Sequence, residues 1–289
     1  MKQLILTIVV AALVASGVTF LLPQQAEGPA PAATRESAYD RVMRTGVLRC
    51  GYFLYPRFFD INPNTGEKSG LIFDLMSLIA EDLSLKVEWV KEVPLSEFAA
   101  ALESGRIDAM CGPLGIIPSR LRASLFTRPF SYMPIYPVVR ANDTRFDASL
   151  SALNSPEHTI SAIEGQATGI LARRIFPSAK LTEIIDMSGI TGALNEVVTG
   201  KADVVFMDRP TFNDFISKNP GSLKIAGQDL LGVYATGMAL PLGEHSLKAL
   251  IDGAISYQID SQVFASLVKK YQLGDGMLPL ANGYAERAE

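Results

Sequence analysis

The chain has few of the residues that build catalytic and metal centres. Its 289 residues include only two histidines, two cysteines and one tryptophan. His158 and His245 each follow a glutamate but lie far apart in the sequence, so neither a metal site nor a catalytic dyad is indicated. The Gly-x-Ser-x-Gly signature of a serine nucleophile is absent as well. We therefore predict no cofactor and no metal ion.

Charge is also scarce, and the two signs nearly balance. Charged residues make up 19% of the chain, and 26 Lys and Arg against 30 Asp and Glu leave a net charge of -4. Lysines and arginines form no cluster, which argues against nucleic acid and anionic lipid as partners. A hydrophobic share of 48% can build a sizeable core, and the length suggests two domains. A small solute fits this composition better than a macromolecule.

One long apolar run is present, at the N-terminus. Residues 4–22 contain no charge, and a Pro/Ala-rich stretch follows them. A secretory signal has an apolar region of about 7 to 15 residues and a membrane span needs about 20, so residues 1–22 can be a cleaved signal peptide or a membrane anchor. Residues 23–37 then form a linker. We expect the rest of the chain to be periplasmic or otherwise extracytoplasmic, and tethered to the inner membrane if the segment is an anchor.

A short pattern occurs twice, at residues 102–110 and 197–205. Each copy has the end of an apolar-periodic stretch, a Gly, a cation, an Asp and an apolar run. This pattern predicts a helix, a left-handed turn and a buried parallel strand. Because ligands collect beyond the carboxyl ends of parallel strands, Arg120 and Asp208, which follow the two copies, are the first candidates for a binding site.

The acids inside the pattern, Asp108 and Asp203, occupy the same place in both copies and are interpreted as structural. The cysteines lie at the ends of two predicted strands, with Cys50 before Gly51 and Cys111 before Gly112. They can form a disulfide if the strands are neighbours, or they can be two small core residues. The second alternative is favoured, because adjacent parallel strands rarely give disulfide geometry.

Several short segments between residues 40 and 275 share their order and spacing with one family. They are Gly46–Gly51, Tyr55–Phe58, Gly70–Leu75, Gly105–Ala109, Ile117–Arg120, Phe126–Phe130, Gly200–Asp208 and Leu267–Tyr271. Through them the chain resembles the extracytoplasmic solute-binding proteins of amino-acid ABC importers, which have the type II periplasmic-binding fold. The resemblance implies two doubly wound α/β lobes joined by hinge strands: lobe 1 at 38–136 and 236–276, lobe 2 at 137–235, and a flexible tail at 277–289.

The resemblance also implies a function and a set of contacts. A monomer would capture a small amino-acid-like or carboxylated solute between the lobes and deliver it to a membrane permease. Arg120 matches the arginine that binds the ligand's carboxylate through its planar fork of donors, and Asp208 matches the carboxylate that takes the ammonium. Tyr55, with Phe58 beside it, matches the aromatic position that packs on the ligand, and Leu95 is the opposite apolar wall.

Two places depart from the family pattern. Hydroxyl residues near the carboxylate position are replaced by Gly112–Gly115, whose proline has no N–H, and Gly115 is kept as a candidate contact. The Gly-Thr-Thr turn of lobe 2 is replaced by Gly165–Thr168, where Gln166 or Thr168 could supply the polar group at a helix N-terminus. We therefore expect a ligand that is smaller, more apolar or not a standard α-amino acid.

Other interpretations stay open. Arg120 could be a surface arginine, and Asp208 could be the N-cap of a helix that starts at Arg209. A periplasmic enzyme similar to cyclohexadienyl dehydratase is the second functional hypothesis, since one fold supports many functions, and Glu164 is the nearest candidate for its general acid. A membrane-tethered ligand sensor is the third.

Overall fold

The computed structural model describes residues 36–185, 190–274 and 278–279. The predicted signal or anchor segment lies outside these residues, as do most of the linker and of the C-terminal tail. The described residues from Ser37 onward form one compact unit. Within the described ranges, no helix combines the length and the apolar character that a membrane span requires.

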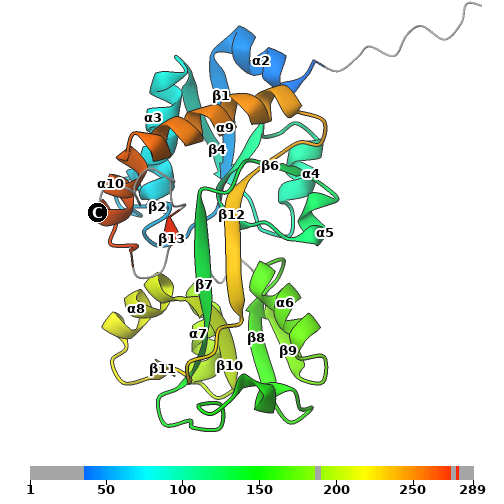
Figure 1. Ribbon diagram of the computed structural model, residues 1–289, viewed down its shortest axis with the longest axis vertical. Coiled ribbons are helices and arrows are strands. Elements are labelled where there is room, and N and C mark those ends of the chain that lie inside the picture. Colours follow the sequence, from blue (N-terminus) through cyan, green and yellow to red (C-terminus); the bar gives the residue numbers. More distant parts are fainter. Residues whose placement is uncertain (1–35, 186–189, 275–277, 280–289) are drawn as a thin grey trace, which may run out of the picture. The chain divides into compact units, whose positions relative to one another are not determined.

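The first group of elements, called lobe 1, is built around strand β1. This strand pairs in parallel with β4 on one side and β5 on the other. Helix α9 packs against α2 and α3, so the C-terminal part of the chain returns to lobe 1 (Figure 1). The elements are α2 (Ala38–Thr45), β1 (Val47–Tyr52), β2 (Asp60–Ile61), β3 (Lys68–Ser69), α3 (Leu71–Asp82), β4 (Lys86–Glu92), α4 (Phe98–Glu103), β5 (Ala109–Gly115), α5 (Pro118–Leu121), β6 (Leu125–Phe126), α9 (His245–Asp260) and α10 (Val263–Lys270).

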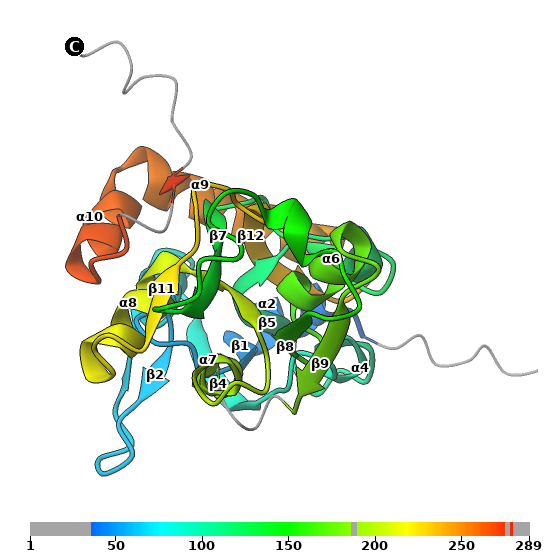
Figure 2. The same ribbon diagram turned by 90° about the horizontal axis from the view of Figure 1, so that it is seen from below.

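The second group, called lobe 2, repeats this plan around strand β8. This strand pairs in parallel with β9 and β10. Helices α6 and α8 lie on opposite sides of strand β7 (Ser131–Arg140), which pairs with β10 (Figures 1 and 2). The elements are a 3-10 turn (Leu150–Leu153), β8 (Thr159–Ile163), α6 (Ala167–Ile175), β9 (Lys180–Ile184), α7 (Ile190–Val198), β10 (Val204–Asp208), α8 (Arg209–Lys218) and β11 (Leu223–Ile225).

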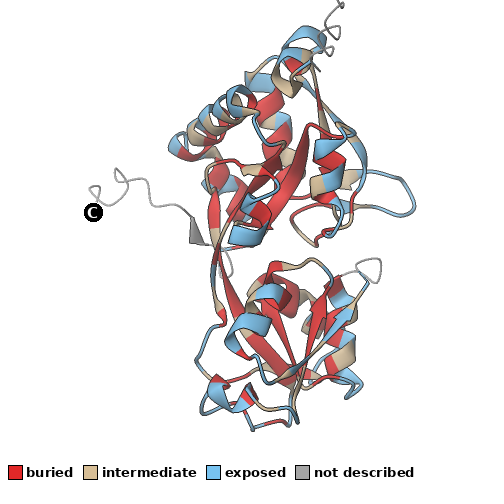
Figure 3. Cartoon of the chain, turned by 90° about the vertical axis from the view of Figure 1, so that its right-hand side faces the viewer, coloured by how far each residue is buried: buried red, intermediate tan, exposed pale blue. Residues whose placement is uncertain are grey.

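Two long strands connect the lobes. Strands β7 (Ser131–Arg140) and β12 (Gly232–Leu240) pair with each other in antiparallel fashion, and they pair with β10 in lobe 2 and β5 in lobe 1, respectively. The order is therefore β4-β1-β5-β12-β7-β10-β8-β9, with short β13 (Leu278–Pro279) beside β7. The central strands β5, β8 and β10 are buried, whereas the edge strands β4 and β9 are partly exposed (Figure 3). The lobe boundaries expected near residues 136 and 236 fall within β7 and β12, and they stay a prediction.

The doubled sequence pattern has the structural role that we predicted. Gly105 and Gly200 follow their helices with φ of 67° and 77°, the left-handed values of a helix-ending turn. The N–H of Asp108 donates to the carbonyl of Arg49 on β1 (2.8 Å), and the Asp108 carboxylate accepts from the N–H of Arg49 (2.7 Å). Asp203 makes the same two bonds, at 2.8 and 2.9 Å, to Thr159 at the start of β8.

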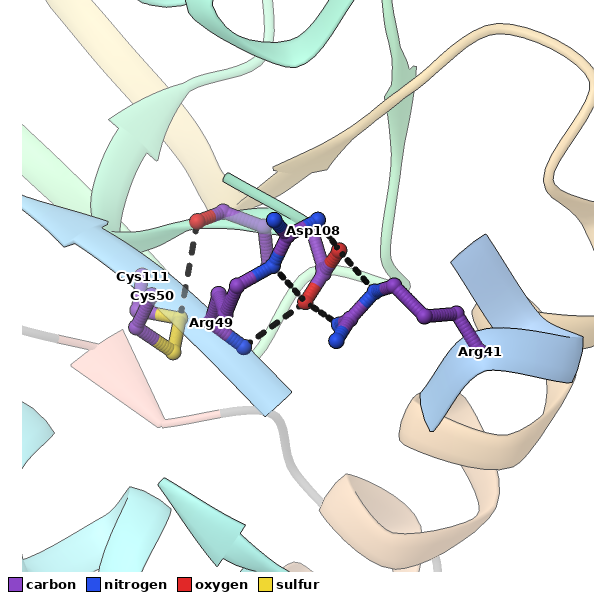
Figure 4. Close-up of a disulfide and its surroundings, with 6 residues drawn as sticks. Arg41, Arg49, Cys50, Asp108 and Cys111 are labelled. Atoms are coloured by element: carbon purple, nitrogen blue, oxygen red, sulfur yellow. Dashed lines mark hydrogen bonds and ion pairs between the residues drawn. A yellow bond between two sulfur atoms is a disulfide. The ribbon is translucent and has the colours of Figure 1, made fainter. Parts of the chain in front are cut away.

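Each aspartate thus links the strand that follows it to a neighbouring parallel strand by hydrogen bonds. Both carboxylates are further neutralised by arginines. Asp108 forms ion pairs with Arg41 and Arg49 (Figure 4), and Asp203 forms ion pairs with Arg140 and Arg145. Hydrogen bonds and paired charges of this kind offset the cost of burying a carboxylate, so the structural interpretation of these acids is confirmed.

The two cysteines form a disulfide in the core of lobe 1 (Figure 4). Cys50 faces Ala109 across the β1–β5 pair, and Cys111 lies two residues further along β5. The pairing of β1 with β4 is irregular after Cys50, and the Cys50 and Cys111 Cα atoms are 5.5 Å apart, a separation that a disulfide accepts. The structure therefore differs from the favoured interpretation of two separate core cysteines.

Candidate functional site

A cavity of about 60 Å³ lies where lobe 1, lobe 2 and the connecting strands meet. Lobe 1 contributes Phe53, Tyr55, Leu95, Pro113, Leu114, Gly115 and Arg120 to its wall. Lobe 2 contributes Gln166, Ala167 and Thr168, and the connecting strands contribute Met133, Ile135, Tyr234 and Thr236. Six of the predicted contacts therefore lie together, namely Tyr55, Leu95, Gly115, Arg120, Gln166 and Thr168. Phe58 and Asp208 are absent from this lining.

Arg120 is the only lysine or arginine in this lining. It lies in the short helix α5, which follows directly after β5, and its side chain is 7% exposed. Its guanidinium donates to the carbonyls of Gly115 (3.0 Å) and Gly165 (2.7 Å), so it contacts both lobes. Burial lowers the pKa of Arg120 to about 10, which leaves it protonated at neutral pH. No acidic side chain in the described part of the chain pairs with this buried cation.

The N-terminus of helix α6 faces the same cavity. Gln166 is its N-cap residue, but its side chain makes no capping hydrogen bond, and Ala167 and Thr168 form the first turn. The N–H groups of a first helical turn have no partner within the helix and carry a partial positive charge. Together with Arg120 they make this end of the cavity attractive to an anion.

Gly165, just before α6, brings lobe 2 against lobe 1. Its φ is 73°, and a Cβ placed on it would lie 2.7 Å from the backbone nitrogen of Ser96 and 2.9 Å from the carbonyl carbon of Leu95. Such a contact is too close for any side chain. Glycine is therefore required here both by the left-handed backbone and by the approach of the lobes.

Asp208 ends β10 and is the N-cap of α8. Its carboxylate accepts hydrogen bonds from the backbone N–H and the hydroxyl of Thr211, both at 2.9 Å, and a third one from the hydroxyl of Tyr55 in lobe 1. Burial raises the pKa of Asp208, and these hydrogen bonds oppose the shift. The helix-cap alternative is thus what the structure shows, and the contact with a ligand's ammonium stays a prediction.

Tyr55 lines the cavity with its ring and reaches Asp208 with its hydroxyl. Burial and the neighbouring Asp208 carboxylate raise the pKa of this hydroxyl well above its usual value. Phe58 is fully buried behind Tyr55, with ring centroids 4.7 Å apart, so it supports the wall from the core. The aromatic contact that sequence reasoning missed is Phe53, whose ring lies 5.8 Å from that of Tyr55 and which lines the cavity itself.

Four other missed residues come from the connecting strands. Met133 and Ile135 lie two positions apart on β7, and Tyr234 and Thr236 lie two positions apart on β12. Side chains two apart share one face of a strand, so the alternation was available as a signal. Which face of the two strands lines the cavity depends on their antiparallel pairing, and the sequence does not reveal this pairing.

Glu164 does not take the position that the enzyme hypothesis required. Its side chain is exposed, and it is not part of the cavity wall. Among the described residues, no aspartate or glutamate lines the cavity. The same part of the chain contains no cluster of three or more His, Cys, Asp or Glu residues that could hold a metal ion.

A small cavity between two α/β lobes, with a buried cation at one end, defines a two-lobed solute-binding protein. The chain belongs to the bacterial extracellular solute-binding proteins of family 3, whose family model matches residues 54–274. It is 26% identical over 209 residues to a probable amino-acid ABC transporter-binding protein of Haemophilus influenzae, covering 72% of this chain and 77% of that protein. It is 24% identical over 193 residues to the probable amino-acid-binding protein YxeM of Bacillus subtilis, covering 66% and 69%.

Solved structures show the same fold. An ancestral amino-acid-binding protein, a precursor of cyclohexadienyl dehydratase, matches with a TM-score of 0.70 at 23% identity, covering 82% of this chain and 99% of that one. The solute receptor for L-cysteine of Neisseria gonorrhoeae matches with a TM-score of 0.71 at 19% identity, covering 88% and 97%. The predicted α/β type II periplasmic-binding fold and the predicted family are therefore confirmed.

Proposed function

We propose that the protein is the solute-binding component of an ABC-type importer and that it captures a small carboxylated or amino-acid-like solute between its lobes. The family, the amino-acid-binding and ABC-transporter names of the curated relatives, and the position of the cavity support this proposal. A solute that contacts both lobes stabilises the closed form by its greater affinity for that form. A membrane permease would then recognise the closed form.

The proposal rests mainly on the burial of the Arg120 side chain and on its hydrogen-bond partners. Arg120 is 93% buried on a cavity wall, donates to two backbone carbonyls and lies 5.6 Å from the centre of the Phe98 ring, and no acidic side chain among the described residues pairs with it. Burying a charge without such a partner is unfavourable. A carboxylate in the cavity would accept from the remaining N–H groups of Arg120 and face the N-terminus of α6.

The proposal is tested by native mass spectrometry of the purified protein, followed by calorimetric titration with the standard amino acids and a series of short carboxylic acids. Arg120→Met removes the proposed anion partner, while Arg122→Met, at the exposed end of the same short helix, is the matched control. Loss of one partner from a buried charged pair costs about 2 to 5 kcal/mol, so Arg120→Met should bind at least about 30-fold more weakly. Equal affinities of the two variants would contradict the proposed role of Arg120.

We further propose that the site binds its solute without transforming it. The exposed position of Glu164 supports this, as does the absence of an acidic side chain from the described wall of the cavity. Incubation with prephenate or arogenate should release no aromatic product, monitored by ultraviolet absorbance. Turnover that is lost in Glu164→Gln would instead support an enzyme.

Extracytoplasmic location and a monomeric state are also part of the proposal. The family consists of extracellular proteins. Whether residues 4–22 are removed or anchor the protein stays a prediction. The intact mass of the mature protein distinguishes the two forms.

A further inference from the structure

We infer that the ligand is a small monocarboxylate with an apolar body and no ammonium group. This inference rests on the proposed function, because it assigns the chemical class of the solute that Arg120 would bind. It follows from an asymmetry between the two ends of the cavity. One end of the cavity presents unbalanced positive charge, whereas the carboxylate that would balance a ligand's ammonium is bound to the protein itself.

The anion end of the cavity is narrow and well defined. Arg120 donates to Gly115 on one side and to Gly165 on the other, so its guanidinium is held in place between the lobes. A Cβ on Gly115 would lie 3.1 Å from the Cβ of Ala167 and 3.9 Å from a terminal nitrogen of Arg120. Gly115 therefore packs closely against the first turn of α6, and the planar carboxylate of a ligand matches the fork geometry of the guanidinium beside it.

The acidic end is closed to the ligand. Asp208 is 1% exposed, and three donors, two from Thr211 and one from Tyr55, bond to its two oxygens. Tyr55 belongs to the cavity wall and Asp208 does not, and the hydroxyl of Tyr55 bonds to this carboxylate. An ammonium group would reach Asp208 only after Tyr55 had left it.

Displacing Tyr55 would disturb a connected set of contacts. The turn from Tyr55 to Phe59 is closed by hydrogen bonds at 2.9 Å between the backbones of these two residues. Arg57, in the middle of the turn, donates to Asp214 on helix α8 at 3.0 Å, and so the turn contacts the helix that begins after Asp208 at a second point. Both contacts join lobe 1 to lobe 2. Moving Tyr55 away from Asp208 therefore also loosens the closed form.

The rest of the wall offers no replacement for Asp208. Most of it is apolar, as Phe53, Leu95, Met133 and Ile135 illustrate. Among its other side-chain oxygens, those of Thr168, Thr236 and Gln166 are uncharged; Thr168 donates to Gln166 (3.1 Å), and the Thr236 hydroxyl bonds to that of Ser131 (2.6 Å). An ammonium group would thus lose its water without gaining a charged partner, whereas an alkyl chain gains by leaving water.

The volume of the cavity limits the size of the acid. A cavity of about 60 Å³ is small for a ligand site, which usually measures about 300 to 1,000 Å³. Acids on the scale of propionate and butyrate are therefore the expected ligands, and pairs that differ only by the ammonium group can test the inference directly.

The experiment compares butyrate with L-2-aminobutyrate, and isovalerate with L-valine, by calorimetric titration of the full-length protein after unfolding and refolding to remove carried-over solute. Within each pair, the acid should bind at least tenfold more tightly. Equal or tighter binding of the amino acid would overturn the inference but leave the proposed function intact. Failure of every acid and amino acid to bind would overturn both.

Two variants test whether the Tyr55–Asp208 contact causes the preference for the acid over the amino acid. Tyr55→Ala opens the path to Asp208 and should reduce the preference for the acid at least tenfold, while Tyr55→Ala combined with Asp208→Asn should restore it. The readout is a ratio of two affinities in one protein, so a general loss of stability does not change it. An unchanged ratio in Tyr55→Ala would refute the role of the Tyr55–Asp208 contact. If Tyr55→Ala fails to fold, the wild-type pairs alone decide the inference.

Discussion

The contact between Gly165 and the Leu95–Ser96 backbone provides a direct test of lobe closure. Gly165→Ala adds one methyl group at a point where its carbon would lie 2.7 Å from the Ser96 nitrogen. Gly221→Ala is a closely matched control. Gly221 also belongs to lobe 2, its φ of 74° is nearly that of Gly165 at 73°, and a Cβ on it would meet nothing within 4 Å.

Both variants should lose stability, but only Gly165→Ala should also lose ligand affinity. An alanine in the left-handed region costs about 1 to 2 kcal/mol in either place, so both should lower the melting temperature by a few degrees. Only Gly165→Ala must also push the lobes apart. Overpacking a tight contact costs about 1 to 3 kcal/mol, and because this cost falls on the closed form alone, ligand affinity should drop about 5- to 150-fold.

Three measurements separate these effects. Differential scanning calorimetry of the free proteins gives the shared loss of stability, and titration calorimetry with the tightest-binding solute of the panel gives the specific loss of affinity. Small-angle X-ray scattering should show a larger radius of gyration for Gly165→Ala than for Gly221→Ala. If Gly165→Ala binds the solute as tightly as the control does, the close approach of residue 165 to residues 95–96 is not part of the bound form, and the reasoning is refuted.

Three further predictions concern stability. Replacing Cys50 and Cys111 together by serine should lower the free energy of unfolding by about 2 to 4 kcal/mol in chemical denaturation, because the disulfide spans 61 residues. A fully stable double variant would contradict a constraining role for the bridge. The interlobe pair Arg57–Asp214 is about one quarter exposed on both sides, so a double-mutant cycle should give a coupling of at most about 1 kcal/mol that disappears in 1 M salt. For Asp203, burial raises the pKa, but hydrogen bonds to arginines and to backbone outweigh it and hold the pKa below its usual value of 3.8. Its stabilising contribution is therefore present above pH 3.8 and is lost as the pH falls through the folded-state pKa. Wild type should exceed Asp203→Asn in stability at pH 7, and the gap should narrow below about pH 4; a gap independent of pH would show that the charge of Asp203 does not matter.

Local patterns and the family resemblance together predicted the fold and six of the fourteen residues that line the cavity. The Gly, cation and Asp of the doubled pattern act within a few residues of chain or on the next strand, so helix end, turn and strand follow from neighbouring residues. Arg120 could be placed for the same reason, because a strand end and the short helix after it bring its side chain to the edge of the sheet.

The sequence by itself therefore determined the α/β class, the two similar lobes and the position of the buried cation. Only the tertiary structure decided which residue of lobe 1 bonds to the Asp208 carboxylate. Its bond to Tyr55 joins residues 153 positions apart and exists because the lobes meet, so no periodicity or spacing could show it. The same is true of the disulfide, which depends on the register of β1 against β5. Contacts between distant segments depend on how whole elements pack, and in this protein such a contact adds the hydroxyl of Tyr55 to a carboxylate that already caps helix α8 through Thr211.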